Sequence, residues 1–299
     1  MVLYPTLFTP QNVPRDGVRW YMRTKFSFGI LGFGNMGKAL GTAAAAESSR
    51  KIQVYDTRAS VLKPLRTHPK LKRQFRVCGS AAELFTHAEA VVLAVKPQDL
   101  RAVLRAESGC ILERKPLLIS IAAGIPLSLF TRELPGVRVV RAMPNLPAQV
   151  RNSVTFLCAG RHARKKDMEC ARRLFSAAGE VWVMRESLLD SVTAVSGSGP
   201  GYVFYFMHCM YEEAVRMGMT RAQARRTVLE TFLGAGRLAK ASGTQFDRLV
   251  AQVASPKGTT EAAFAEFRKG KLKDTIQRGI RRAAARAAEL SRVYTKERA

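Results

Sequence analysis

Residues 26–37 read FSFGILGFGNMG, an apolar run that leads directly into a GxGxxG motif. In this motif Gly32 permits a tight turn, Gly34 lets the backbone approach a pyrophosphate, and Gly37 allows a helix to pack closely on the strand. The first amides of that helix have no acceptors within the helix, so they bind the anion. The motif alone is generic, but a strand, the glycines, a helix and a second strand follow one another here in order. The sequence therefore predicts a dinucleotide-binding β-α-β unit.

Short β-branched runs alternate with helical stretches from residue 26 to residue 184, which is typical of stacked βα units. Strands are expected at residues 26–31, 52–55, 90–95, 117–121 and 137–141, with later additions to the same sheet at 154–158 and 181–184. Helices are expected at residues 36–47, 98–107 and 163–178. The run AVVLAV at 90–95 is continuously apolar, as expected for a strand covered on both faces. We therefore predict an α/β Rossmann-like domain over residues 25–185.

The pattern becomes purely helical in residues 186–299, where no strand is expected. Helices are expected at residues 202–217, 221–241, 246–253, 259–267 and 272–293, with Gly and Pro between them. Apolar residues occupy almost every face of helix 202–217, so this helix must be buried. A domain of about 110 residues has limited capacity to bury it alone. We therefore predict an all-α dimerisation domain that forms an obligate homodimer, and an N-terminal extension over residues 1–24.

The formal net charge is +26 at pH 7, from 49 Lys and Arg residues against 23 Asp and Glu residues. One interpretation is nucleic-acid binding, because an extended basic face attracts phosphates. The favoured interpretation is a solvated surface whose positive field attracts anionic cofactors and substrates. The basic residues are dispersed and no nucleic-acid-binding motif accompanies them, so a nucleic-acid partner is not expected.

The remaining bulk features exclude several classes of site. Five cysteines and four histidines form no metal-ligand spacing, so neither a metal site nor a Cys-His catalytic pair is predicted. No apolar run reaches the roughly 18 residues that span a bilayer. Residues 1–24 hold three arginines but little serine and three prolines, so they resemble a mitochondrial presequence only weakly. A cytoplasmic location is expected, with the mitochondrion as the second choice.

The residues after the expected strands predict where a cofactor binds. Asp56 lies where a carboxylate accepts hydrogen bonds from an adenosine ribose and selects NADH, whereas Arg58 lies where an arginine holds the 2′-phosphate of NADPH. The surrounding basic charge favours NADPH, NADH remains the alternative, and an ordinary turn at Asp56-Thr57 is a third interpretation. The predicted cofactor-binding residues at the strand ends are Leu31, Gly32, Phe33, Gly34, Asn35, Met36, Gly37, Asp56, Thr57, Arg58, Ala94, Val95, Lys96, Pro97, Ala122, Ala123 and Gly124.

Six segments carry a family resemblance. They are the glycine motif at 32–37, AVKP at 94–97, AAG at 122–124, RAMPN at 141–145, VSGSGP at 195–200 and SPKGTT at 255–260. In this order the segments resemble the pyrroline-5-carboxylate reductases, over residues 26 to about 293. The specific part is the pairing of a Ser-Gly-Ser-Gly-Pro helix start with a Ser-Pro-x-Gly-Thr-Thr loop in an all-helical second domain.

The resemblance implies reduction of 1-pyrroline-5-carboxylate to L-proline, the last step of proline biosynthesis, with NADPH or NADH. It also implies homodimers that interlock through their helical domains and assemble further into rings such as decamers. The substrate would lie between the nicotinamide of one chain and the Ser-Pro-x-Gly-x-Thr loop of its partner. By position, Glu186, Gly258, Thr259 and Thr260 would bind the substrate, and Gln252 stands where an asparagine or aspartate near the cofactor is usual.

The residues of the 255–260 loop suit this chemistry. Backbone amides around residues 258–261 would bind a carboxylate at a helix N-terminus, with Ser255 as the N-cap and Pro256 as the first helical residue. A protonated cyclic imine already carries the positive charge that hydride transfer needs, so the protein supplies orientation and a dry pocket. Thr260 is the predicted catalytic residue: its hydroxyl would hydrogen bond the ring nitrogen, and its alternative role is to satisfy a helix amide.

Two positions depart from the family pattern, and each leaves two readings open. Lys257 replaces the usual glycine, so it either reinforces carboxylate binding or points into solvent, and Gln252 must reach the cofactor by another route if it contacts it. A 2-hydroxyacid dehydrogenase on a similar scaffold would need a lysine in the first long helix of the second domain, and residues 202–218 contain none. Three further hypotheses compete with the reductase: a different imine reductase, a nucleic-acid-binding protein and an inactive scaffold.

Overall fold

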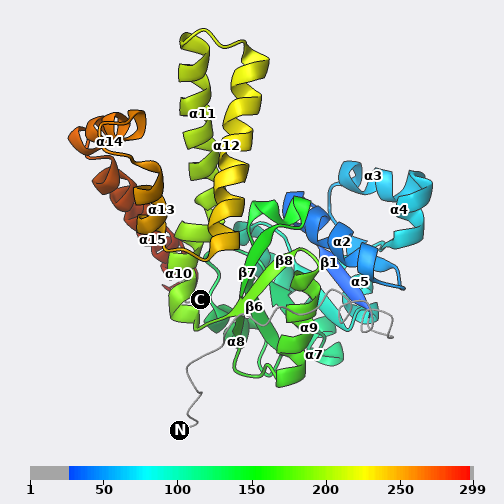
Figure 1. Ribbon diagram of the computed structural model, residues 1–299. Coiled ribbons are helices and arrows are strands. Elements are labelled where there is room, and N and C mark those ends of the chain that lie inside the picture. The colour runs from blue at the N-terminus through cyan, green and yellow to red at the C-terminus, as the bar shows by residue number, and fades with distance from the viewer. Residues whose placement is uncertain (1–26, 297–299) are drawn as a thin grey trace. The chain divides into compact units, whose positions relative to one another are not determined.

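The computed structural model of the chain describes residues 27–296, which divide into two compact units (Figure 1). The first unit holds residues 27–197 together with 284–296, and the second holds residues 198–283. The predicted boundary at residue 186 lies where the strands end. The first unit continues beyond that point because Leu189 and Ala194, in the short helical turns after the last strand, are fully buried within it. The predicted extension 1–24 lies outside the described residues.

One eight-stranded sheet forms the centre of the first unit, in the order β3-β2-β1-β4-β5-β6-β7-β8. The strands are β1 (Phe28–Leu31), β2 (Ile52–Tyr55), β3 (Phe75–Val77), β4 (Ala90–Leu93), β5 (Leu117–Ser120), β6 (Val139–Met143), β7 (Ser153–Ala159) and β8 (Gly179–Val183). All neighbouring strands run parallel except β6 and β7, which pair antiparallel. The seven predicted strands are confirmed, including the two later additions. β3 is absent from the prediction because three residues are too few to show a period.

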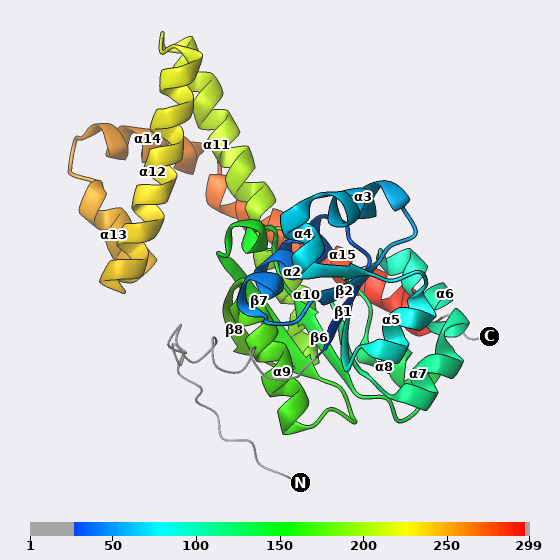
Figure 2. The same ribbon diagram turned by 90° about the vertical axis from the view of Figure 1, so that its right-hand side faces the viewer.

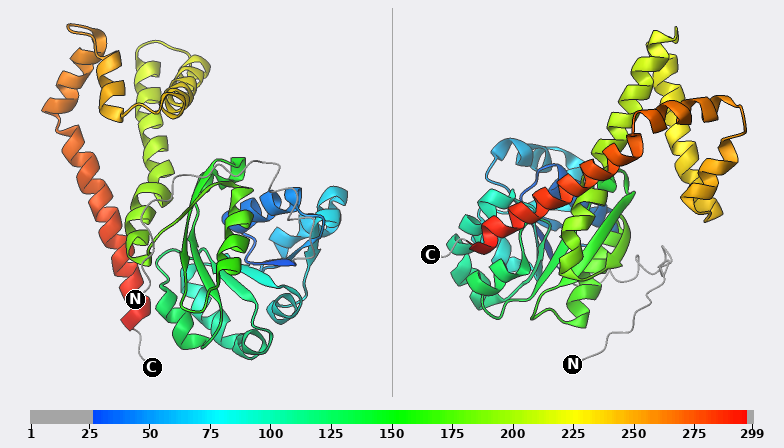
Figure 3. Two further views of the ribbon diagram at one scale, coloured as in Figure 1. Left: turned by 60° about the horizontal axis from the view of Figure 1, so that its bottom comes forward. Right: turned by 90° about the vertical axis from the view of Figure 1, so that its left-hand side faces the viewer.

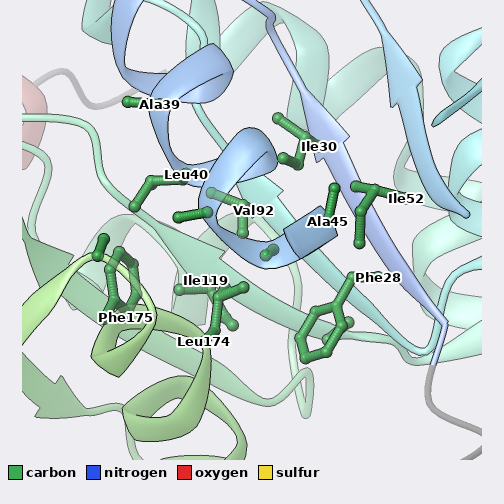
Figure 4. Packing of buried hydrophobic residues seen from close by; sticks show 14 of the residues in the cluster. Phe28, Ile30, Ala39, Leu40, Ala45, Ile52, Val92, Ile119, Leu174 and Phe175 are labelled. Carbon is green, nitrogen blue, oxygen red and sulfur yellow. The ribbon is translucent and has the colours of Figure 1, made fainter. Parts of the chain in front are cut away.

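Helices cover both faces of this sheet, because successive residues of each strand point to opposite faces. Val92 belongs to one buried core and Val91 to the other. The first core is covered by α2 (Asn35–Glu47), α3 (Ala59–Thr67) and α9 (Lys165–Ser176), and the second by α5 (Ala81–His87), α6 (Pro97–Ala106), α7 (Ser108–Arg114) and α8 (Leu127–Glu133). Figure 4 shows Leu40 of α2 and Phe175 of α9 in the first core, near Val92. Coverage of both faces explains why the central strands are continuously apolar.

The remaining elements of the first unit are short. They are α4 (Pro69–Gln74), η1 (Leu146–Val150), η2 (Glu186–Leu188), α10 (Leu189–Val192) and the π-helical turn η3 (Thr193–Gly197). With α3, α5, α7 and α8 these elements are absent from the sequence-based prediction. The longest of them, α3, spans nine residues and the others seven or fewer, so few helical turns are available to show a hydrophobic period.

Helices make up the second unit throughout residues 198–283. They are α11 (Gly199–Arg216), α12 (Arg221–Ser242), α13 (Phe246–Val253), α14 (Thr259–Lys269) and the start of α15 (Leu272–Lys296), whose last residues belong to the first unit. α11 and α12 lie side by side as a hairpin (Figures 1 and 2), and a capping box between Thr220 and Gln223 begins α12. Figure 3 shows α15 as one continuous helix. All five predicted helices are confirmed.

The second unit leaves most of its large apolar side chains uncovered. No residue of α11 is buried within the chain, and in α12 only Ala224 and Val228 are. The exposed set on α11 to α13 is Val203, Phe204, Tyr205, Phe206, Met210, Leu229, Leu233, Leu238, Phe246, Val250 and Val253. Large exposed apolar surfaces mark interaction sites. The predicted burial of residues 202–217 therefore requires a second chain. None of the described helices has the length and apolar character needed to cross a membrane.

Candidate active site

A cleft of about 1030 Å³ opens in the first unit at the carboxyl ends of β1, β2 and β4. Its wall comes from the turn after β1, the residues after β2 and the residues after β4. The three strands are neighbours in the sheet, and the strand order reverses between β1 and β4. In open α/β sheets ligands bind at this reversal, because the loops that follow the two strands diverge there. The volume is that of a small-molecule or cofactor site.

The turn between β1 and α2 is too crowded for side chains at two of its glycines. Gly32 has φ of +91°, and a Cβ on it would lie 2.8 Å from the backbone of Ala94. A Cβ on Gly37 would lie 2.1 Å from the carbonyl oxygen of Gly32. Gly34 is different, because the nearest atom to its Cβ would be Nη2 of Arg58 at 3.5 Å. The space in front of Gly34 is therefore open to the cleft, as a pyrophosphate requires.

The first turn of α2 presents uncapped amides to this space. Gly34 is the N-cap and has no side chain, and no acidic residue lies in the first turn. The first N–H groups of a helix have no acceptor within it, and they carry the positive end of the helix dipole. The turn after β1 therefore has the geometry and the charge of an anion-binding site.

Asp56 is buried at the end of β2, and its carboxylate is fully engaged by this chain. Oδ2 accepts from the amide of Phe33 at 2.7 Å and from Nη2 of Arg58 at 2.9 Å. Oδ1 accepts from the amide of Arg58 at 2.9 Å and from its Nε at 3.0 Å. Burial by itself would raise the pKa of Asp56, but these hydrogen bonds hold that pKa below its ordinary value. Asp56 is thus an ionised anchor with its four acceptor positions filled.

Arg58 lies on the wall of the cleft with its side chain 56% exposed. Asp56 holds it through Nε and one N–H of Nη2, so the remaining guanidinium N–H groups have no partner within residues 27–296. The pairing also raises the pKa of Arg58, which stays protonated. Arg58 is therefore fixed in place and can still donate to an anion in the cleft.

Most of the predicted cofactor residues lie on the wall of the cleft. These are Leu31, Gly32, Phe33, Gly34, Asn35, Met36, Asp56, Thr57, Arg58, Ala94, Val95 and Lys96. The wall also contains residues that the sequence analysis did not name, which are Lys38, Tyr55, Val61, Pro64, Ala81, Asp99, Val103, Ala106 and Glu107. Four of these, from Asp99 to Glu107, follow the spacing of one helix face after β4. That periodicity is the signal that could have found them.

The other predicted cofactor residues do not lie on this wall. Gly37 is buried behind the turn, where it makes the close contact with Gly32. Pro97 is the first residue of α6, and Gln252 lies on α13 in the second unit. The 122–124 turn follows β5, and at Gly124 a Cβ would lie 3.1 Å from Leu290 of α15. In the first unit the end of α15 thus packs on this turn, which sequence periodicity alone could not predict.

Glu186 makes two contacts inside the first unit. Its Oε1 accepts from the backbone amide of Leu127 at 2.7 Å and from Nη1 of Arg141 at 2.9 Å. The first contact satisfies an amide at the start of α8, and the second neutralises an arginine that is only 5% exposed. Glu186 does not lie on the wall of the cleft. Its predicted contact with a substrate stays a prediction, and its observed contacts hold α8 and β6 together.

The 255–260 loop of the second unit differs from its prediction at the start of α14. The N-cap is Gly258, not Ser255, and Pro256 precedes the helix by three residues. The amide of Gly258 donates to the carbonyl of Ser255 at 3.0 Å, which closes a turn with Pro256 and Lys257 in the middle. Proline second and a residue of positive φ third are the signature of a type II turn. Lys257 has φ of +62°, which explains why glycine is usual there.

Thr259 and Thr260 are the first two residues of α14. Because Gly258 provides no side-chain cap, the first amides of this helix are available to an anion, as predicted for this loop. Glu261 occupies the first turn but forms an ion pair with Arg268. The loop therefore combines uncapped amides with two hydroxyl groups at one helix end.

Comparisons with known proteins agree on one family. A family model described as pyrroline-5-carboxylate reductase dimerisation matches residues 186–290, and one described as NADP oxidoreductase, coenzyme F420-dependent, matches residues 27–124. The pyrroline-5-carboxylate reductase of Pseudomonas aeruginosa is 37% identical over 268 residues, which cover 88% of this chain and 96% of that protein. The enzyme of Methanosarcina acetivorans is 36% identical over 88% of this chain and 97% of its own. The chain belongs to the pyrroline-5-carboxylate reductase family.

Solved structures of the pyrroline-5-carboxylate reductase family have the same fold. The Coxiella burnetii enzyme superposes with a TM-score of 0.80 at 31% identity, over 90% of this chain and 99% of that one. The Plasmodium falciparum enzyme, solved with NADP bound, has a TM-score of 0.80 at 25% identity over the same shares. The predicted family and the predicted order of a Rossmann-like domain and a helical dimerisation domain are therefore confirmed.

In this member of the family the cleft is lined by groups that bind phosphate, and not by nucleophilic side chains. Lys38, Arg58 and Lys96 line it together with backbone amides, and its wall has no histidine or cysteine. Burial raises the pKa of Cys158 to about 11 and that of Cys170 to about 12, so these thiols stay protonated at neutral pH. No group of three His, Cys, Asp or Glu side chains able to hold a metal ion occurs within residues 27–296.

Two glycine variants should separate the fold from the ligand site. Gly34→Ala places its Cβ in ordinary contact, 3.5 Å from Nη2 of Arg58, so the midpoint of urea unfolding should stay within error while the Kd for NADPH rises about tenfold or more. Gly37→Ala, the matched control, forces the Cβ onto a backbone oxygen and should lower the unfolding midpoint clearly. A Gly34→Ala variant that binds NADPH as tightly as the wild type would show that the cofactor does not approach this backbone.

Lys257→Gly should stabilise the second unit by about 1 kcal/mol, because glycine adopts positive φ without the Cβ penalty. The free energy of unfolding, measured by urea titration, is the readout. Lys269→Gly is the control, because it removes the same side chain from the last residue of α14, where φ is helical, and should destabilise through lost helix propensity and the lost pair with Glu266. Equal destabilisation by both variants would mean that the turn does not hold residue 257 at positive φ.

Proposed function

We propose that this protein reduces 1-pyrroline-5-carboxylate to L-proline with NADPH as the hydride donor. The observation that carries the proposal is the presence of an uncapped helix N-terminus in each of the two units of this family member. One lies at α2 above the cleft of the first unit, and the other lies at α14 beside two threonines. The activity is that named for relatives which match 88% of the chain at 36–37% identity.

The cofactor proposal rests on Asp56 and Arg58. A ribose 2′-hydroxyl would have to compete with four existing hydrogen bonds to bind Asp56, so NADH gains little from this carboxylate. A 2′-phosphate would instead meet the free N–H groups of Arg58, and charge-assisted hydrogen bonds of this kind are strong. The uncapped start of α3, which follows Arg58 and has no acidic residue in its first turn, adds to the attraction. NADPH is therefore the proposed cofactor, with its pyrophosphate at the start of α2.

The bound dihydronicotinamide supplies the hydride, and the residues of this chain bind and orient the substrate. Backbone amides from Gly258 to Glu261 bind the substrate carboxylate at the start of α14. Thr259 contacts the substrate, and the Thr260 hydroxyl oxygen accepts a hydrogen bond from the N–H of the protonated ring nitrogen, which favours the protonated imine and orients it. No strong acid or base is needed, because the protonated imine is already electrophilic. Lys257, which belongs to the 255–260 loop, adds positive charge for the carboxylate.

A homodimer is part of the proposal. The chain carries the dimerisation domain of the family, and α11 exposes its large apolar residues. If α11 of one chain packed on α11 of a second chain, the exposed apolar residues of both helices would be buried. In the predicted arrangement each active site combines the cofactor cleft of one chain with the 255–260 loop of its partner. That arrangement requires this dimer. Assembly into decamers, the cofactor contact of Gln252 and a cytoplasmic location stay predictions.

Cofactor oxidation with synthetic pyrroline-5-carboxylate tests the reaction, with proline identified as the product. Thr260→Val, which removes the hydroxyl without changing shape, should lower kcat/KM for the imine by about 10- to 100-fold while the Kd for NADPH is unchanged. Thr231→Val on the exposed face of α12 is the control and should leave both values alone. Wild-type turnover by the Thr260→Val variant would leave this hydroxyl only a helix-capping role. If folded protein binds NADPH but does not turn over pyrroline-5-carboxylate, the proposed substrate is wrong.

Arg58→Gln should lower kcat/KM for NADPH by about 10- to 100-fold, because it removes the charge-assisted bonds to the 2′-phosphate. The value for NADH should stay level or rise, since Asp56 is then freed to accept from the ribose. Arg76→Gln is a matched control, because Arg76 is 52% exposed and also pairs with an acidic side chain, Glu83. An equal loss with both cofactors would contradict the assignment, and so would a similar loss in Arg76→Gln.

A further inference from the structure

The connection between β2 and β3 is strongly and uniformly basic. Residues 58–76, which we call the cationic arm, comprise Arg58, α3, α4 and the first two residues of β3. The arm contains Arg58, Lys63, Arg66, Lys70, Lys72, Arg73 and Arg76, and it contains no acidic residue. Figure 1 shows α3 and α4, coloured cyan, projecting from the sheet beside β1 and α2. Because β3 is an edge strand, the arm lies at one end of the sheet.

Five of these cations are not neutralised. Arg58 pairs with Asp56 and Arg76 pairs with Glu83. The other five side chains are exposed and have no ion-pair or hydrogen-bond partner within residues 27–296, and they are Lys63, Arg66, Lys70, Lys72 and Arg73. Elsewhere in the first unit arginines converge on acids, as Arg101 and Arg105 do on Glu133. The arm therefore carries a net positive charge on exposed side chains that form no ion pair or hydrogen bond within residues 27–296.

The arm borders the cofactor cleft. Arg58, Val61 and Pro64 lie on the wall of the cleft, so α3 borders it. The five unpaired cations do not line the wall: two lie on α3 and three on α4. This side of the cleft follows β2, which is the side that holds the adenosine ribose in dinucleotide-binding folds. The ligand group nearest the arm would be the 2′-phosphate of NADPH, which adds about 1.5 to 2 negative charges at neutral pH. NADH has no charge at that position.

We propose that the cationic arm steers NADPH into the cleft and selects it over NADH in the rate of association. This inference rests on the proposed function and deepens it, because Arg58 then selects the bound cofactor whereas the other five cations act before binding. A cleft bordered by charges of one sign raises the association rate of an opposite charge by about 10- to 1000-fold, and salt removes the effect. The charges lie beside the 2′-phosphate, so the gain is larger for NADPH.

The test is stopped-flow association of NADPH and of NADH, followed by the fluorescence of the reduced nicotinamide. The arm variant is Lys63→Gln/Lys70→Gln/Lys72→Gln. The control is Arg161→Gln/Lys165→Gln/Lys166→Gln, which removes the same charge from exposed cations at the start of α9. The control lies away from the cleft, because Gly160 bonds to Val139 at the amino end of β6 whereas the cleft opens at carboxyl ends. Both triple variants replace exposed side chains, so their unfolding midpoints should match the wild type.

At low ionic strength, about 0.02 M, the association rate constant of the arm variant for NADPH should fall by about fivefold or more relative to the wild type. Its rate constant for NADH should fall by less than about twofold. Near 1 M salt, where the Debye length is about 3 Å, it should match the wild type. The control should change both rates less than about twofold. Equal effects of the two variants, or equal effects on the two cofactors, would overturn the proposal. NADPH binding without imine turnover would overturn the proposed reaction and leave the steering result standing, since no substrate is used.

Discussion

The close contact between Gly37 and the carbonyl oxygen of Gly32 is the constraint on which the site depends. A Cβ at residue 37 would sit 2.1 Å from that oxygen, so only glycine lets α2 start this near β1. The contact fixes the axis of α2 and aims its uncapped amides at the space beyond Gly34. The cleft, its anion-binding end and its position at the strand reversal all follow from that one approach.

Charge in the cleft is organised around one buried carboxylate. Asp56 ties the turn after β1 to the residues after β2, because it accepts from Phe33 and from Arg58 at once. A buried ionised group is costly unless its acceptors are filled, and here all four are. The same bonds that satisfy Asp56 hold Arg58 at the wall. A residue type that suggests NADH by sequence position therefore acts in this fold as the support for a cation.

The sequence was sufficient for the elements with a long or repeated signal. Seven strands, the long helices and twelve residues of the cleft wall follow from hydrophobic period and from the glycine motif. It failed where the outcome depends on tertiary contacts or on a single turn. The helix was expected from residue 259, but its predicted cap was wrong: Ser255 and Pro256 belong to a turn closed by the amide of Gly258, and Gly258 is the N-cap. The packing of Leu290 on Gly124 joins residues far apart in the chain, which no local pattern encodes.

The second unit holds both the exposed apolar surface and the loop proposed to bind the substrate. It buries few of its own large side chains, and Phe204 and Tyr205 are 55% and 69% exposed. Its stability must then come largely from a partner, since apolar burial is the main favourable term in folding. The 255–260 loop belongs to the same unit, so the amides proposed to bind the substrate are held in place only as firmly as that unit is folded. The proposed role of this loop in the reaction therefore depends on the proposed dimer, because the apolar surface that needs a partner lies in the same unit.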